Sequence, residues 1–390
     1  MKNKFQTANV TIIAFAHLLH DTYSAFLAPI LPLLIDKLGI SLFQAGLLDV
    51  MRKLPSLANP FIGLIADKVS VRYFVIFSPL ITAICMSLLG IAPTYLVLLV
   101  LLFVAGISNT LFHVPSPVMI KHISSNQIGK GMSFYMLGGE LARTIGPLAI
   151  LGAVSLWKLE GTYRLLPFSL LATIILFIKL RKIKVTQGIS QKEKTFKARE
   201  VLIKLLPFFF ILSGFLTFRQ VLKICLTMYL PTYLTQNGSS LWIAGISLSV
   251  LQFSGAIGTL FAGSISDKIS RRTSLLIISI ANPLLMWIFL LVQGPLTFVV
   301  LVIMGFFLFA SGPVVLALVH DIDSEHPSFI NGTFMMINFV MSSIIVLLVG
   351  FLGDKIGLDL TYKISSVLSL GAIPFVFFLP KKSKYNLMKR

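Results

Sequence analysis

The amino-acid sequence predicts an all-α integral membrane protein with twelve transmembrane helices in two pseudo-symmetric six-helix bundles. Three observations predict this fold class. Of the 390 residues, 56% are hydrophobic and only 12% are charged, whereas a soluble domain carries about 25% charged residues. Apolar runs of about 20 residues, long enough to cross a bilayer, recur along the whole chain. The two halves of the chain also resemble each other at an offset of about 200 residues.

Each apolar run is expected to be a helix, because a helix satisfies all of its backbone polar groups within lipid. Runs such as YLVLLVLLFVAGI do not alternate between polar and apolar residues, which argues against a β-barrel. The first run follows a basic start but lacks a signal-peptide cleavage site, so we expect it to be retained. The expected spans, in order, are 9–35, 42–66, 73–91, 94–120, 129–154, 163–181, 202–234, 241–266, 273–292, 296–319, 328–352 and 359–380.

The basic residues predict the orientation of these spans. With both termini in the cytoplasm, most of the 33 Lys and Arg fall on the cytoplasmic side, as the positive-inside rule requires. The outer side then holds only Lys37, Lys158, Arg164, Lys355 and Lys363. Membrane topology therefore accounts for the net charge of +19, and no nucleic-acid partner is expected. We expect a monomeric, multi-pass protein of the cell (inner or plasma) membrane.

One long polar segment divides the chain. We expect an N-terminal six-helix bundle at 1–181, a cytoplasmic basic linker at 182–200 and a C-terminal six-helix bundle at 201–390. Three alignments support duplication: QAGLLDV with IAGISLS, ILPLLI with YLPTYL, and GMSFYMLGG with GTFMMINFV. Duplicated membrane halves indicate a transporter whose substrate path runs between them near the bilayer midplane.

A charged cassette occurs twice, as GLIADKVSVRY after the second span and GSISDKISRRT after the eighth. The pair resembles the signature of the major facilitator superfamily, and that resemblance implies a latch that holds the two halves in one orientation. Serines stand at 70 and 270, where the superfamily commonly has Gly, so we expect a looser turn. The latch residues are Gly63, Asp67, Lys68 and Arg72 in the first cassette, and Gly263, Asp267, Lys268, Arg271 and Arg272 in the second.

Within that superfamily, the first 150 residues resemble the fosmidomycin-resistance group of efflux proteins. The resemblance rests on AHLLHDTYSAFLAPILPLL, LFHVPSP and GGELARTIGPLAI. The first stretch contains the group's His-Leu-Leu-x-Asp element at 17–21, and the second carries its His-Pro pair with Val114 inserted between His113 and Pro115. The third also resembles the antiporter motif of drug exporters. Together these similarities imply export.

Asp21 lies about 12 residues into the first span, near the middle of the membrane, where an ionisable side chain is costly and therefore a functional candidate. His17 is one turn away on the same face, and His20 is alongside. Histidines that titrate near neutral pH beside a carboxylate indicate a proton-coupling site. The alternative is that both histidines only form hydrogen bonds to neighbouring helices.

The fifth span carries Glu140 and Arg143 three residues apart, and we expect them to pair, because an unpaired buried charge costs more than a paired one. The pair is either structural or a site where Glu140 exchanges Arg143 for a proton or substrate. His113, at the inner end of the fourth span, is either functional or a packing histidine.

Arg219 and Lys223 in the seventh span correspond to the region of Asp21 when Pro32 and Pro231 are aligned. They could bind an anionic substrate such as a phosphonate. They could equally form a salt bridge between the halves.

Asp49, Arg52 and Lys53 form a further set at helical spacing near the outer surface. They are candidates for an outer gate or for a structural cluster in contact with water. The run HDIDSEHP at 320–327 is expected to be a solvated loop, and Cys85 and Cys225 are expected to form no disulfide. No metal site is expected. The sequence contains no nucleotide-binding motif or nucleophile elbow, so we expect no cofactor and no enzymatic activity.

These features predict a secondary active transporter that works by alternating access and is driven by the proton gradient. Its partners would be protons, the lipid bilayer and a small molecule. The favoured mode is proton-coupled efflux of a small anionic or amphiphilic compound. The alternatives are a proton-coupled uptake permease for an organic anion, and a non-transporting membrane sensor or membrane-embedded enzyme.

Overall fold

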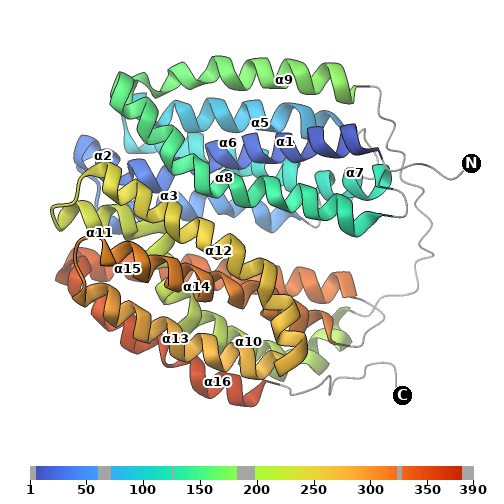
Figure 1. The fold of residues 1–390 in the computed structure, drawn as a ribbon, viewed down its shortest axis with the longest axis vertical. Coiled ribbons are helices and arrows are strands. Elements are labelled where there is room, and N and C mark those ends of the chain that lie inside the picture. The colour runs from blue at the N-terminus through green and yellow to red at the C-terminus, as the bar shows by residue number, and fades with distance from the viewer. Residues whose placement is uncertain (1–5, 60–71, 125–126, 182–197, 323–326, 380–390) are drawn as a thin grey trace, which may run out of the picture. The chain divides into compact units, whose positions relative to one another are not determined.

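A computed structural model describes residues 6–59, 72–124, 127–181, 198–322 and 327–379, and every element in these residues is a helix (Figure 1). The all-helical prediction is confirmed. Ten helical segments in the described residues are long and apolar enough to cross a membrane. The last, Ile330–Phe378, contains two of the predicted spans, and the predicted span at 42–66 is described only as far as residue 59.

The chain forms two compact units. The first comprises Met1–Ser41, Leu47–Ser190 and Leu234–Ser249, and the second comprises Leu42–Gly46, Gln191–Tyr233 and Val250–Arg390. The short exchanged pieces, 42–46 and 234–249, were not foreseen in the sequence boundaries.

The first unit is built mainly from helices in the first half of the sequence. Their bounds are α1 Thr7–Ser24, α2 Leu27–Leu38, α3 Leu42–Lys53, the 3₁₀ turn η1 Leu54–Ala58, α5 Arg72–Ser87, η2 Leu89–Ile91, α6 Tyr95–His113, α7 Pro115–Ile123, α8 Ile128–Trp157, η3 Leu159–Leu165 and α9 Leu166–Leu180.

The second unit is built mainly from helices in the second half of the sequence, including one short π-helical turn. Their bounds are α10 Ala198–Ile224, the π turn η4 Cys225–Tyr229, α11 Leu230–Gln236, α12 Leu241–Ile269, α13 Arg271–Leu291, α14 Leu296–His320, α15 Pro327–Ser369 and α16 Ala372–Phe378. Within α15, Gly357 has a φ of 78° and separates the two spans predicted on either side of it.

Prolines explain where the first and seventh spans change direction. α1 ends at Ser24 and α2 begins at Leu27, because Pro29 has no N–H to donate to the carbonyl of Ala25. In the corresponding place of the second half, the π turn lies just before Pro231. Both irregularities fall where the duplicated sequence predicted equivalent helices.

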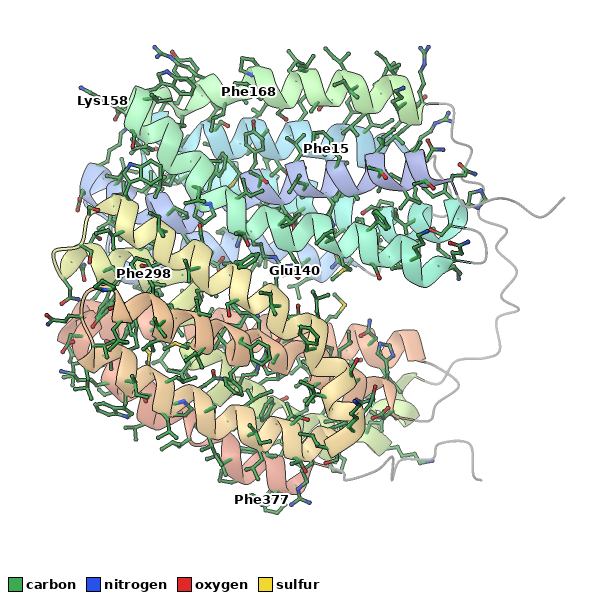
Figure 2. All side chains as sticks on the ribbon, in the orientation of Figure 1. Phe15, Glu140, Lys158, Phe168, Phe298 and Phe377 are labelled. Carbon is green, nitrogen blue, oxygen red and sulfur yellow. The ribbon has the colours of Figure 1, made fainter. Side chains whose placement is uncertain are left out.

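Side chains sort into a packed interior and an apolar exterior within each unit. Phe112, Met119 and Tyr135 belong to the core of the first unit, and Phe208 and Phe215 to that of the second. By contrast, Phe168 on α9 and Phe377 on α16 are 62% and 52% exposed, and Figure 2 shows both rings projecting outward. Such exposed apolar side chains suit a surface in contact with lipid rather than water.

Candidate functional site

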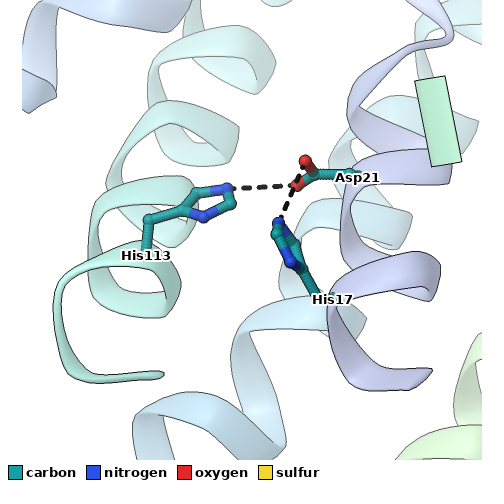
Figure 3. Close-up of side chains that lie close together, drawn as sticks. All are labelled: His17, Asp21 and His113. Carbon is teal, nitrogen blue, oxygen red and sulfur yellow. Dashed lines mark hydrogen bonds and ion pairs between the residues drawn. The ribbon is translucent and has the colours of Figure 1, made fainter. Parts of the chain in front are cut away.

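Two helices of the first unit, α1 and α6, bring three ionisable side chains together: Asp21 and two histidines. The carboxylate of Asp21 on α1 lies 3.3 Å from Nε2 of His17 and 3.1 Å from Nε2 of His113 on α6 (Figure 3). Asp21 is 9% and His17 4% exposed, while the side chain of His113 is 32% exposed. The histidine–carboxylate cluster expected from residues 17 and 21 is therefore present, and His113 completes it.

The other ring nitrogen, Nδ1, of each histidine also has a hydrogen-bond partner. Nδ1 of His17 lies 2.8 Å from the backbone carbonyl oxygen of Tyr135 on α8, and this Nδ1 must carry the proton because a carbonyl only accepts. Nδ1 of His113 lies 3.3 Å from the hydroxyl of the same tyrosine. Tyr135 thus contacts Nδ1 of both rings, and Nε2 of each ring is directed at Asp21.

His20 does not join this cluster as an ion-pair partner. It is fully buried and stacks on Phe112, and its Nε2 lies 3.4 Å from Oδ1 of Asn109. Successive residues on a helix are about 100° apart, so His20 and Asp21 point in different directions. Of the two histidine roles weighed from the sequence, His20 has the hydrogen-bonding geometry and His17 has the ion-pair geometry.

Glycines of α8 allow α1 to approach closely enough to place His17. A Cβ at position 139 would lie 2.5 Å from Cε1 of His17, and one at 146 would lie 2.6 Å from Cβ of Ala25. A Cβ at 138 would collide with the carbonyl oxygen of Ala14. Small residues at helix contacts are typical of membrane proteins. Close packing against α1 therefore explains the GG pair of this helix without invoking an antiporter motif.

The break in the fourth span places His113. α6 ends at His113 and α7 begins at Pro115, because Pro115 cannot donate a hydrogen bond to the carbonyl four residues earlier. The stretch LFHVPSP therefore sets His113 at a helix end. From there its ring reaches Asp21.

Two further charged groups of the first unit are paired as predicted. Nη2 of Arg143 lies 3.2 Å from Oε1 of Glu140. Asp49, which is 3% exposed, accepts hydrogen bonds from Arg52 at 2.9 Å and Lys53 at 2.5 Å. The assignment of that second cluster to an outer gate stays a prediction.

Arg219 in the second unit differs from these pairs. Its Nε donates to the hydroxyl of Ser311 at 2.5 Å, and among the described residues it forms no ion pair with a carboxylate. It lines a cavity of about 20 Å³ together with Asn282, whose Oδ1 is buried without a hydrogen-bond partner. Lys223 lies with Nζ 5.7 Å from the ring centre of Phe309. The predicted relation of these bases to Asp21 stays a prediction.

The second charged cassette is described in full, and its centre is Arg271. This guanidinium lies 2.5 Å from Asp267 and 3.2 Å from Asp321, while Arg272 lies over the ring of Phe377. Ser270 adopts a φ of 86°, the left-handed region that favours Gly, and its hydroxyl oxygen accepts from the amide of Thr273. The looser turn expected at 270 stays a prediction.

Two of the predicted latch residues of this cassette have simpler surroundings. Gly263 has open space at its Cβ position, and Lys268 lies in the last turn of α12. In the first cassette, Gly63, Asp67 and Lys68 lie outside the described residues, and Arg72 begins α5.

The three side chains around Asp21 also form, among the described residues, a group whose ligand atoms lie within 4.8 Å of one another, close enough for a metal ion. The expectation that the chain has no metal site stays a prediction. The run at 320–327 lies partly outside the described residues. Cys85 and Cys225 are both buried as free thiols.

The sequence did not predict the residues that lie on the Nδ1 side of the two histidines. Tyr135 on α8 and Ser116 on α7 hydrogen-bond to each other at 2.9 Å, and neither is a charged residue type that stands out in the sequence as Asp21 does. Tyr135 is 3% exposed. A hydroxyl buried in a core usually has a hydrogen-bond partner, and that was the signal available for finding it.

Comparison with known proteins decides the family. The model of the Major Facilitator Superfamily matches residues 13–346. The chain belongs to the major facilitator superfamily of membrane transporters. It is 24% identical to the fosmidomycin resistance protein of Escherichia coli (strain K12) over 384 residues, which covers 95% of this chain and 93% of that protein. It is 23% identical over 304 residues to the multidrug resistance protein MdtG of Enterobacter lignolyticus, covering 74% of this chain and 71% of that protein.

Solved structures share the fold of this superfamily member. A bacterial homologue of the human lysosomal transporter Spinster, in an inward-facing and unoccupied conformation, has a TM-score of 0.79 at 16% identity and covers 96% of this chain and 97% of that chain. The D-xylose-proton symporter has a TM-score of 0.75 at 16% identity and covers 97% and 99%. These likenesses concern the fold alone. The protein is thus a multi-pass membrane transporter with relatives named for drug resistance.

Proposed function

We propose that this transporter is a proton-coupled exporter of a small anionic or amphiphilic compound, and that Asp21 and its two histidines carry the coupling protons. The observation that carries the proposal is the charge environment of Asp21. Among the described residues this buried carboxylate forms ion pairs with histidines only, whereas Asp49 and Glu140 are each paired with Arg or Lys.

The difference between these partners matters for coupling. Arg and Lys keep their charge at physiological pH, but histidine gains or loses a proton between about pH 5 and 8. The charge of the Asp21 cluster therefore follows proton binding, while the other two carboxylates stay neutralised by permanent cations. An unpaired charge inside a membrane protein is costly, so gaining or losing a proton changes the relative stability of the transporter's states.

The proposed cargo follows from Arg219. A half-buried guanidinium without a carboxylate partner among the described residues suits an anionic group, which guanidinium binds through two parallel hydrogen bonds. The hydroxyl of Ser311 fixes Nε and leaves the two Nη groups for a ligand. Export is favoured over uptake because the fosmidomycin and multidrug resistance relatives are named for resistance.

Everted membrane vesicles test this function directly. The probes are fosmidomycin, as an anionic compound, and ethidium, as an amphiphilic one. We expect at least one probe to accumulate inside vesicles whose lumen is acidified, to leave when a protonophore collapses the gradient, and to be unaffected by EDTA.

Other outcomes would contradict the proposal in distinct ways. Accumulation in right-side-out vesicles under an inward proton gradient would indicate the uptake permease. No gradient-dependent movement of either probe would argue against the exporter and in favour of the sensor or enzyme. Loss of transport with EDTA would show that a metal ion, and not only protons, occupies the site.

A further inference from the structure

Tyr135 contacts both histidines of the Asp21 cluster through different parts of the same residue. Its backbone carbonyl oxygen accepts from Nδ1 of His17 at 2.8 Å, and its ring stacks on that imidazole with centres 4.0 Å apart. Its hydroxyl lies 3.3 Å from Nδ1 of His113. One residue of α8 therefore supports a histidine of α1 and a histidine of α6.

The direction of each hydrogen bond follows from counting protons. The hydroxyl of Ser116 lies 2.6 Å from the carbonyl oxygen of Phe112 and 2.9 Å from the hydroxyl of Tyr135. Because a carbonyl only accepts, Ser116 gives its single proton to Phe112 and accepts the proton of Tyr135. The tyrosine oxygen must then accept from His113, whose Nδ1 carries a proton.

We propose that Tyr135 is the positioning residue of the proton site, which fixes both histidines in the Nδ1–H tautomer so that each must gain a proton to hydrogen-bond Asp21. This inference rests on the proposed function, because it describes how the coupling site takes up its protons. In this tautomer a neutral ring presents the lone pair of Nε2 to a carboxylate oxygen, and two acceptors cannot bond each other.

The number of protons that the site can hold follows from this arrangement. A proton at the His17–Asp21 contact and another at the His113–Asp21 contact complete the two hydrogen bonds at 3.3 and 3.1 Å. The site in this geometry accommodates two protons. The other titratable group facing it is His20 on α1, which is turned toward Asn109, and no Lys or Arg of the described residues forms an ion pair with Asp21.

Nitrogen-15 NMR of histidine-labelled protein in proteoliposomes tests the inference, because the two neutral tautomers and the imidazolium have different shifts. The chain has 6 histidines, and the His17→Gln and His113→Gln variants assign the two signals. In the wild-type protein, titrated from pH 5 to 9, we expect both rings to be Nδ1–H when neutral.

Tyr135→Phe separates the role of the hydroxyl from the roles of the ring and the backbone carbonyl. It removes the hydroxyl but keeps the ring and the backbone carbonyl, so we expect His17 to remain Nδ1–H and His113 to change to Nε2–H. The neutral His113 can then donate to Asp21 without gaining a proton.

Ser116 provides a second route to the same result that leaves Tyr135 intact. Ser116→Ala frees the tyrosine proton to be donated to His113, which again favours the Nε2–H tautomer, whereas Ser116→Thr keeps the hydroxyl and should restore the wild-type signal. Ser133→Ala is the matched control, because its hydroxyl bonds only the carbonyl of Gly129 on its own helix.

An Nε2–H signal from either neutral ring of the wild-type protein would overturn the inference, as would an unchanged His113 tautomer in the folded Tyr135→Phe protein. Failure of the proposed function looks different: both wild-type rings are Nδ1–H, yet neither transport probe follows a pH gradient. Conversely, gradient-driven transport by a protein whose rings are Nε2–H refutes the positioning role alone.

Discussion

Replacing Gly139 by Ala should uncouple transport by displacing one imidazole. The added Cβ would lie 2.5 Å from Cε1 and 2.7 Å from Nε2 of His17. Carbon atoms pack at about 3.5 Å or more, so the ring has to move by roughly 1 Å. Nε2 of His17 starts 3.3 Å from Asp21, and a shift of that size takes it beyond hydrogen-bonding distance.

The energetic effect on folding should be modest, which keeps the experiment interpretable. Overpacking a core costs about 1–3 kcal/mol, and exchanging Gly for Ala within a helix returns about 1 kcal/mol. The net loss of stability is therefore about 0–2 kcal/mol. Gly152→Ala is the matched control on the same helix, because nothing lies within 4 Å of its Cβ position.

Proteoliposome transport and thermal unfolding measure the two effects separately. Gly139→Ala should lower gradient-driven transport of the probe at least tenfold, while Gly152→Ala keeps wild-type transport and unfolds at the same temperature or higher. Wild-type coupling and an unchanged pH profile in Gly139→Ala would refute the idea that close packing against α8 sets the position of His17.

Four other substitutions examine the second unit. Arg271→Gln should lower the unfolding free energy by about 1 kcal/mol, because it breaks the contacts with two carboxylates, and Arg272→Gln, measured by the same thermal unfolding, should have a smaller effect. Ser270→Gly should raise the unfolding temperature, since relief of the φ of 86° outweighs a weaker helix cap; a lower temperature would contradict this. Arg219→Gln should weaken binding of the anionic probe at least tenfold and leave the amphiphilic probe unaffected, as equilibrium binding would show; equal loss for both probes would contradict an anion-binding role.

The sequence was sufficient for the features that depend on helical spacing. The all-helical fold follows from the long apolar runs, and the pairing of Glu140 with Arg143 and the approach of His17 to Asp21 follow from residues three or four positions apart. Proline positions alone did not predict where helices break: Pro32 and Pro147 lie inside helices, whereas Pro115 begins α7 next to His113.

Features that depend on contacts between distant segments could not be predicted in this way. The contact of His20 with Asn109 and that of His17 with Tyr135 join residues 89 and 118 positions apart, and the contact of His113 with Tyr135 joins two different helices. The backbone carbonyl that fixes His17 belongs to every residue type, so no sequence pattern marks it. The left-handed turn at Ser270 shows that local preference is also outweighed by the surrounding helices.

Replacing Asp21 by Asn tests the central claim most directly. Asn has nearly the same shape but binds no proton near neutral pH, so it removes proton coupling with little change in packing. In proteoliposomes, we expect Asp21→Asn to retain probe counterflow, which needs no proton gradient, and to lose accumulation driven by a pH gradient. Gradient-driven accumulation at the wild-type level by Asp21→Asn would show that the coupling proton is carried elsewhere.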